Sequence, residues 1–137
     1  MAVHVQVNNL TCEIGTSEFL FSFFSTVAGN LEPKGWGTRF PIVMRQLYSG
    51  ALPAASGSGA LRELTTIHRE LSALVPSKVI WNFENRAALP PWGTQISPDI
   101  TSLANYFVTS NGKDLIGVLT QCLQELAKSG QGELKIQ

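Results

Sequence analysis

Two short alternating stretches at the start of the chain constrain its fold most strongly. Residues 3–7 and 10–14 each alternate apolar with polar side chains, and Asn8 and Asn9 stand between them. Alternation with a period of two predicts a strand with one buried face, and two residues that tolerate positive φ are typical of a tight hairpin turn. The sequence therefore predicts an antiparallel β-hairpin at the N-terminus.

Four later segments have the spacing or the flanking residues of helices. Apolar residues recur at helical spacing after Thr16 and Ser17, which predicts a helix that stops near Gly29-Asn30. Pro41 suits the first position of a short helix. The predicted helices cover residues 17–28, 41–48, 61–74 and 111–130, the last one capped by Asn111 and ended near Gly130.

The remaining segments predict strands and connections. Residues 78–83 are β-branched and aromatic, with apolar side chains on nearly both faces, which indicates a central strand. Residues 105–109 predict another short strand, and the alternation of Leu134 and Ile136 predicts an edge strand at the end of the chain. Small residues make 53–59 a predicted flexible connector, and three prolines make 84–100 irregular.

Strands at both ends of the chain with helices between them predict the α+β class. We expect a mostly antiparallel sheet that starts with the N-terminal β-hairpin, with about four helices packed on one or both of its faces. A length of 137 residues is close to the commonest domain size, so residues 1–137 are expected to form a single domain.

The charge balance argues against nucleic acid as a direct partner. Ten Lys and Arg residues offset ten Asp and Glu residues, and no basic stripe is visible. A basic stripe is what neutralises phosphates in nucleic-acid binding.

The expected compartment is the cytoplasm. The N-terminus has no basic start followed by an apolar block, and the most apolar run, 19–28, is too short to span a bilayer, which needs about 20 residues. Cys12 and Cys122 lack a CxxC partner, so we interpret both as small core residues in a reduced compartment.

No enzyme motif is present. The chain lacks GxGxxG, P-loop, HExxH and GxSxG patterns, and its only histidines are His4 and His68. Nothing in the sequence places an activated partner beside either imidazole. We therefore predict no catalytic residues, no metal site and no cofactor.

Two loops hold the candidate binding residues. Aromatic and charged side chains on backbone fixed by Gly and Pro are typical of binding anchors at a protein surface. The alternative is that Trp36 and Trp92 fold back onto the core, which is where we expect Trp81. The candidates are Trp36, Arg39 and Phe40 in the first loop, and Glu84, Arg86, Trp92 and Asp99 in the second.

The same stretches carry a family resemblance. In order and spacing the chain resembles the bacterial polymorphic-toxin immunity proteins, specifically immunity protein family seventy. The matching stretches are GTSEF at 15–19, SFFST at 22–26, GTRFP at 37–41, KVIW at 78–81, PPWG at 90–93, ISPDI at 96–100 and YFVT at 106–109.

This resemblance implies a small cytoplasmic α+β protein, encoded beside a secreted or contact-delivered toxin, whose partner is the cognate toxin domain. It implies stoichiometric inhibition without chemistry, and the neutral net charge favours an apolar interface over mimicry of phosphates. Two other readings remain open: a self-associating structural or adaptor domain, and a small enzyme using His68 or a loop carboxylate. The sequence leaves monomer and homodimer open as well.

Overall fold

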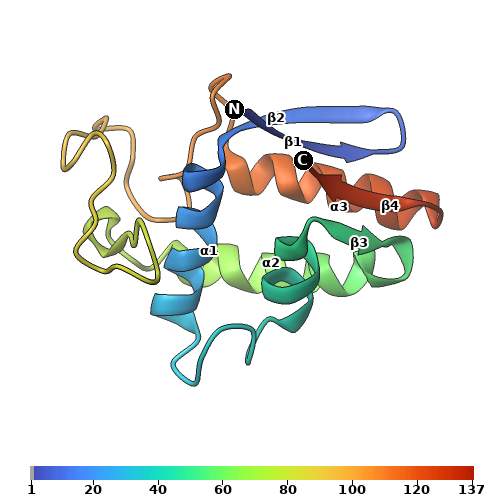
Figure 1. Ribbon diagram of the computed structural model, residues 1–137, viewed down its shortest axis with the longest axis horizontal. Helices are drawn as coiled ribbons and strands as arrows, with labels where there is room; N and C mark the ends of the chain where they lie inside the picture. The colour runs from blue at the N-terminus through green and yellow to red at the C-terminus, as the bar shows by residue number, and fades with distance from the viewer. Residues whose placement is uncertain (1) are drawn as a thin grey trace.

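A computed structural model describes residues 2–137 and shows one four-stranded antiparallel sheet (Figure 1). The spatial order of its strands is β2-β1-β4-β3. The strands are β1 (Ala2–Val7), β2 (Leu10–Thr16), β3 (Ala51–Pro53) and β4 (Glu133–Ile136).

The predicted N-terminal hairpin is confirmed. Val7 pairs with Leu10 across a two-residue turn, in which Asn8 adopts a φ of 51°. The prediction that the last strand lies at an edge is wrong, because β4 pairs with β1 on one side and with β3 on the other. The two chain ends therefore lie side by side: His4 and Gln137 exchange two backbone hydrogen bonds, of 2.7 and 2.9 Å.

Within residues 2–137, four helical elements accompany the sheet, which confirms the α+β prediction. They are α1 (Ser17–Leu31), the π-helix η1 (Ile42–Leu47), α2 (Gly57–Leu71) and α3 (Leu115–Ser129), with the short 3₁₀ turns η2 (Ala54–Ser56) and η3 (Pro76–Lys78) between them. The core lies between the helices and one face of the sheet. The residues that the strands bury completely in it are Val5, Val7, Ile14, Leu52 and Leu134.

The caps explain where two helices begin and end. The hydroxyl of Thr16 accepts a hydrogen bond of 3.1 Å from the amide of Phe19 at the start of α1. Asp114, rather than the predicted Asn111, caps α3 by accepting from the amide of Gly117 at 3.1 Å. Gly130 ends α3 in the left-handed conformation, as predicted.

The predicted flexible connector at 53–59 is ordered instead. These residues complete β3, form η2 and begin α2. Gly57 lies so close to α3 that a Cβ atom would stand 3.3 Å from the backbone nitrogen of Ala127. The missing side chain of Gly57 thus lets the start of α2 approach the end of α3 closely.

The two strands predicted at 78–83 and 105–109 are absent from the sheet. Residues 79–83 run as an irregular segment alongside α1, and the second stretch contributes only an isolated bridge between Val108 and Asp114. In Figure 1 the chain between η3 and α3, yellow to orange, forms a layer of loops beyond α1, at the end of the molecule away from β3. No helix within residues 2–137 has the length and apolar character needed to cross a membrane.

Candidate functional site

A stripe of small and polar residues on α1 positions the irregular segment. We call it the α1 stripe; its members recur at helical spacing and are Ser22, Ser25, Thr26, Gly29 and Asn30. The two serines and the threonine are completely buried. Helix α1 therefore has two packed faces, an apolar one toward the core and a small polar one toward residues 78–86.

The α1 stripe supplies the hydrogen bonds that a neighbouring strand would otherwise supply. The hydroxyls of Ser22 and Thr26 donate to the carbonyl of Ile80 at 2.9 and 3.2 Å, and the Thr26 hydroxyl accepts from the Ile80 amide at 3.0 Å. Buried backbone polar groups must be paired somewhere, and here side chains pair them. The segment is thus held firmly although it belongs to no sheet.

Two further contacts extend this attachment. Ser25 Oγ accepts from the amide of Phe83 at 3.0 Å, and Asn30 Nδ2 donates to the carbonyl of Lys78 at 2.9 Å. Gly29 lies within α1, which continues to Leu31. A Cβ atom at this position would stand 2.1 Å from Cδ1 of Ile80. The predicted helix stop at Gly29-Asn30 is therefore wrong: these residues make room for the segment and bind it.

A pair of tryptophans continues the segment outward. The rings of Trp81 and Trp92 meet edge to face with their centroids 5.5 Å apart. Trp92 Nε1 donates to the hydroxyl of Tyr106 at 2.8 Å, and burial raises the pKa of that hydroxyl. Trp81 is half-buried against the core, so it lies between the core and the exposed Trp92.

Beyond this pair the segment exposes a group of large apolar side chains, which we call the loop surface. Its members, with their exposed fractions, are Leu89 (71%), Trp92 (38%), Ile96 (37%) and Val108 (46%). Two hollows of 350 and 210 Å³ open on it, and Ile96 and Tyr106 line both. The loop surface is therefore continuous across the two hollows.

One cation borders the larger hollow. The Arg86 guanidinium lies over the Phe83 ring, 5.2 Å from its centroid, and the Arg86 side chain also lines the hollow. None of the three ion pairs found within residues 2–137 includes Arg86. Its charge is thus available to a binding partner.

The loop at 32–40 is organised by a buried carboxylate that sequence reasoning missed. Glu32 is 3% exposed and accepts three backbone hydrogen bonds, from Gly37 at 2.9 Å and from Arg39 and Phe40 at 3.0 Å each. A glutamate just after an apolar helix and before a Gly-rich loop only weakly indicates a buried carboxylate, because most glutamates are exposed to solvent.

The three candidates of the first loop make contacts within the protein itself. Trp36 is half-buried, donates to the carbonyl of Met44 at 2.7 Å and packs on Phe83 and Tyr48. Arg39 makes a bidentate pair with Glu70. The expectation that Phe40 lies at the surface is wrong, because its ring is 3% exposed within the core.

The candidates of the second loop remain accessible but do not form one cluster. Arg86 is linked to Trp36 of the first loop through the Phe83 ring, which contacts both side chains. Glu84 and Asp99 are exposed in turns. The Asp99 amide donates to Ser97 Oγ at 3.2 Å, and the Asp99 carboxylate accepts from the same hydroxyl at 3.5 Å. Trp92 lies within the loop surface, next to Leu89 and Ile96, which the sequence analysis did not single out.

A separate groove of 630 Å³ lies between α1 and the chain ends. Val3, Phe21, Tyr48 and Ile136 line it, and Glu18 and Ser49 stand among its polar residues. It is a second surface on which a partner protein could dock.

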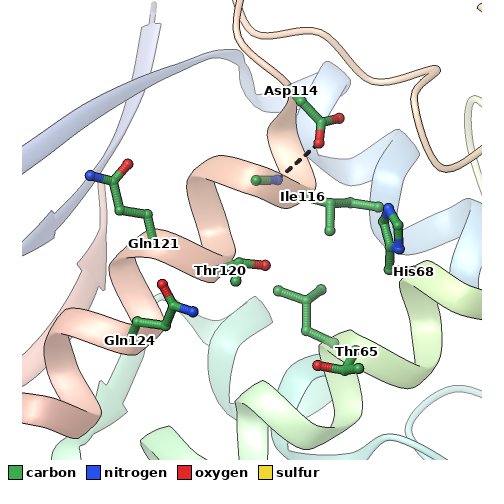
Figure 2. A pocket seen from close by; sticks show the side chains of 9 residues that line it. Thr65, His68, Asp114, Ile116, Thr120, Gln121 and Gln124 are labelled. Atoms are coloured by element: carbon green, nitrogen blue, oxygen red, sulfur yellow. Dashed lines mark hydrogen bonds between the residues drawn. The ribbon is translucent and has the colours of Figure 1, made fainter.

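A hollow of 330 Å³ between α2 and α3 contains the one histidine that the enzyme reading invokes (Figure 2). His68 and Asp114 both line it, and burial raises the pKa of Asp114 while the Gly117 amide and His68 oppose that shift. The dashed line in Figure 2 shows the carboxylate turned toward Gly117. Asp114 therefore has a structural task as the cap of α3. No three His, Cys, Asp or Glu residues within 2–137 are grouped to hold a metal ion.

The α1 stripe was the site feature with the clearest overlooked signal. Ser22, Ser25, Thr26 and Gly29 follow the i, i+3, i+4, i+7 spacing of a helix face. The prediction of this helix rests only on the apolar residues at that spacing. A face of small hydroxyl residues in an otherwise apolar helix indicates close packing against another segment.

Comparison with known proteins gives the family of the chain. The family model described as Immunity protein 70 matches residues 5–136, which is nearly the whole chain. We find no match among curated proteins or solved structures. The matched range includes the hairpin from Val5 on, the α1 stripe, both loops and β4. The chain belongs to the immunity protein 70 family.

Proposed function

We propose that this immunity protein binds a cognate bacterial toxin domain in the cytoplasm and neutralises it stoichiometrically, without chemistry. The toxin would be one delivered by secretion or by contact between cells. The observation that carries the proposal is the loop surface, where four large apolar side chains are exposed around two adjoining hollows. Contiguous exposed apolar surface of this kind is typical of sites of protein association.

The attachment of this segment to α1 suits it to tight binding. A loop that is ordered before it meets its partner loses less conformational entropy on binding than a mobile loop. Slow dissociation matters for an inhibitor of a toxin, because one free toxin molecule acts many times, and rigidity of the interface favours slow dissociation.

The chemistry of the loop surface defines the partner surface that would fit it. An apolar side chain of the toxin would fill the hollow between Leu89 and Ile96, and a toxin carboxylate would pair with Arg86. Trp92 is the anchor we favour among the predicted residues, with Glu84 and Asp99 at the rim. Trp36 instead packs on Phe83 of the segment, Arg39 pairs with Glu70, and Phe40 lies in the core.

The decisive experiment is co-expression of the tagged protein with the C-terminal domain encoded by the neighbouring upstream open reading frame. We expect a stable one-to-one complex and survival of the cells. Leu89→Asp places a charge in the centre of the loop surface and should weaken the complex at least 100-fold, since burial of an unpaired charge is costly. Trp92→Ala should weaken it by about 2 kcal/mol or more.

Two matched variants serve as controls for Leu89→Asp. Ser58→Asp adds the same charge at an exposed position at the start of α2, away from the loops (Figure 1), and should leave affinity unchanged. Ser49→Asp adds it to the groove of 630 Å³. If Ser49→Asp abolishes binding and Leu89→Asp does not, the toxin docks in that groove instead. If no complex forms and the protein self-associates until Leu89→Asp disperses it, the adaptor reading replaces the immunity mechanism.

A further inference from the structure

The two cysteines of the chain, 110 positions apart, meet between the sheet and α3. Cys12 lies in β2 and Cys122 in α3, and their Sγ atoms are 3.8 Å apart. Both are free thiols. A disulfide needs its sulfur atoms about 2.05 Å apart, so the two sulfur atoms must approach each other for the bond to close.

Their environments differ in a way that gives each thiol its own role. Cys12 is half-buried, on the outer strand of the sheet, whereas Cys122 is completely buried. Burial, together with the nearby Cys12, raises the pKa of the Cys122 thiol to about 12. An oxidant from solution therefore reaches Cys12 first, and Cys122 is protected until Cys12 has reacted.

We propose that Cys12 and Cys122 form a reversible intramolecular disulfide when the protein meets a peroxide. The Cys12 sulfur, having lost its proton, attacks one peroxide oxygen; the O–O bond breaks, and the other oxygen leaves as water after protonation. This step gives a sulfenic acid at Cys12. The Cys122 sulfur then gives up its proton, attacks the Cys12 sulfur and displaces the hydroxyl group as a second water. Two thiols and one hydrogen peroxide thus become one disulfide and two waters: sulfur is oxidised and oxygen is reduced.

The expected consequence is a more stable fold rather than a change of shape. The disulfide would close a loop that contains α1, η1, α2 and the whole irregular segment. Closing a long loop restricts the unfolded chain more than the folded one and so favours folding. It would also link the edge strand β2, which pairs only with β1 in the sheet, to α3. The proposal does not depend on which toxin the protein binds.

The test uses the purified, reduced full-length chain, treated with a small molar excess of hydrogen peroxide. We expect both titratable thiols to disappear, the intact mass to fall by two hydrogen atoms, and peptide mapping without reductant to link the Cys12 and Cys122 peptides. The melting temperature should rise by several degrees and return on addition of dithiothreitol.

Two single variants serve as controls. Cys12→Ser keeps a small polar side chain at the half-buried position, and Cys122→Ala keeps the buried position apolar. Peroxide should give neither variant the loss of two hydrogens nor the rise in melting temperature. The proposal is overturned if the wild-type chain keeps its thiols, gains oxygen atoms instead, links only to a second chain, or forms the bond without becoming more stable. These measurements on the wild-type chain decide the matter even if a variant fails to fold.

Discussion

The hydroxyl of Thr26 bonds to both backbone polar groups of Ile80, accepting from the amide at 3.0 Å and donating at 3.2 Å to the carbonyl, which Ser22 also reaches. A single side chain on α1 thus does for Ile80 what a neighbouring strand does within a sheet. This relationship fixes the start of the segment that leads to Arg86, Leu89 and Trp92. The stability of the fold and the geometry of the proposed toxin-binding surface are linked through it.

Removing the Thr26 hydroxyl should therefore destabilise the protein and loosen the loops. Thr26→Val keeps the shape of the side chain but leaves the Ile80 amide without its partner. A buried unsatisfied donor costs about 1–3 kcal/mol. We expect a loss of this size in the free energy of unfolding, measured by urea denaturation, and faster hydrogen exchange at residues 79–83.

The same substitution at an exposed helix position is the control. Thr65 lies on α2, where its hydroxyl donates to the carbonyl of Leu61 within its own helix. Thr65→Val should change stability by less than about 0.5 kcal/mol. Equal effects of the two substitutions would show that the Thr26 hydroxyl has no special part in holding Ile80.

Gly29 and Ile80 should behave as a coupled pair. An alanine is preferred over glycine inside a helix by about 1 kcal/mol, but a Cβ atom at position 29 would overlap Cδ1 of Ile80. We expect Gly29→Ala to destabilise the native chain. In an Ile80→Val background, which removes Cδ1, the same change should be neutral or stabilising.

A double-mutant cycle measures this coupling by urea denaturation of the four proteins. We expect a coupling energy of about 0.5–3 kcal/mol, the range found for residues in contact. Additive effects would mean that Ile80 can turn away from α1 without cost, and that Gly29 is not required for the attachment of the segment.

The sequence predicts the parts of this fold that depend on local patterns. The hairpin, the amphipathic α2 and the end of α3 at Gly130 follow from alternation, helical spacing and capping residues. The position of β4 between β1 and β3 does not, because strand order depends on contacts between residues far apart in the chain. Residues 78–83 have the composition of a strand, and only the hydroxyls of α1 explain why they need no sheet.

The candidate site, like the fold, is predictable from the sequence only in part. Tryptophan and arginine in a Pro- and Gly-rich stretch direct attention to Arg86 and Trp92, and both lie at accessible positions. Leu89 and Ile96 have no distinguishing pattern, since an apolar residue in a loop is as often buried as exposed. Phe40 illustrates the reverse case, because Glu32 holds the backbone of its loop against the protein and the ring turns into the core.

The carboxylate of Glu32 should be essential for the loop at 32–40. Its two oxygens accept from three backbone amides. In Glu32→Gln, an NH₂ group replaces one oxygen and faces donors that it cannot pair with. We expect the free energy of unfolding to fall by about 2–3 kcal/mol, because hydrogen bonds to a charged group are worth more than neutral ones. Glu125→Gln, at an exposed position on α3, is the control and should have no measurable effect. An unchanged urea midpoint for Glu32→Gln would mean that the loop holds its shape without this carboxylate.

The pair of Arg39 and Glu70 should stabilise the protein in a pH-dependent way. The hydrogen bond from Arg39 lowers the pKa of Glu70 below its ordinary value of 4.5, against a smaller opposing effect of burial. A carboxyl group whose pKa is lower in the folded than in the unfolded chain binds fewer protons when folded. Its contribution is therefore complete above the unfolded pKa and is lost as the pH falls through the folded pKa.

Glu70→Gln tests this reasoning directly. Both side chains are partly exposed, so water and salt screen the pair and we expect it to contribute only about 0.5–1 kcal/mol at pH 7. The difference in unfolding free energy between the native chain and Glu70→Gln should disappear once the pH is below the folded pKa of Glu70, and it should shrink in about 1 M salt. A difference that stays constant from pH 7 to the acid range would show that Glu70 acts through packing or neutral hydrogen bonds, since neither of these depends on its charge.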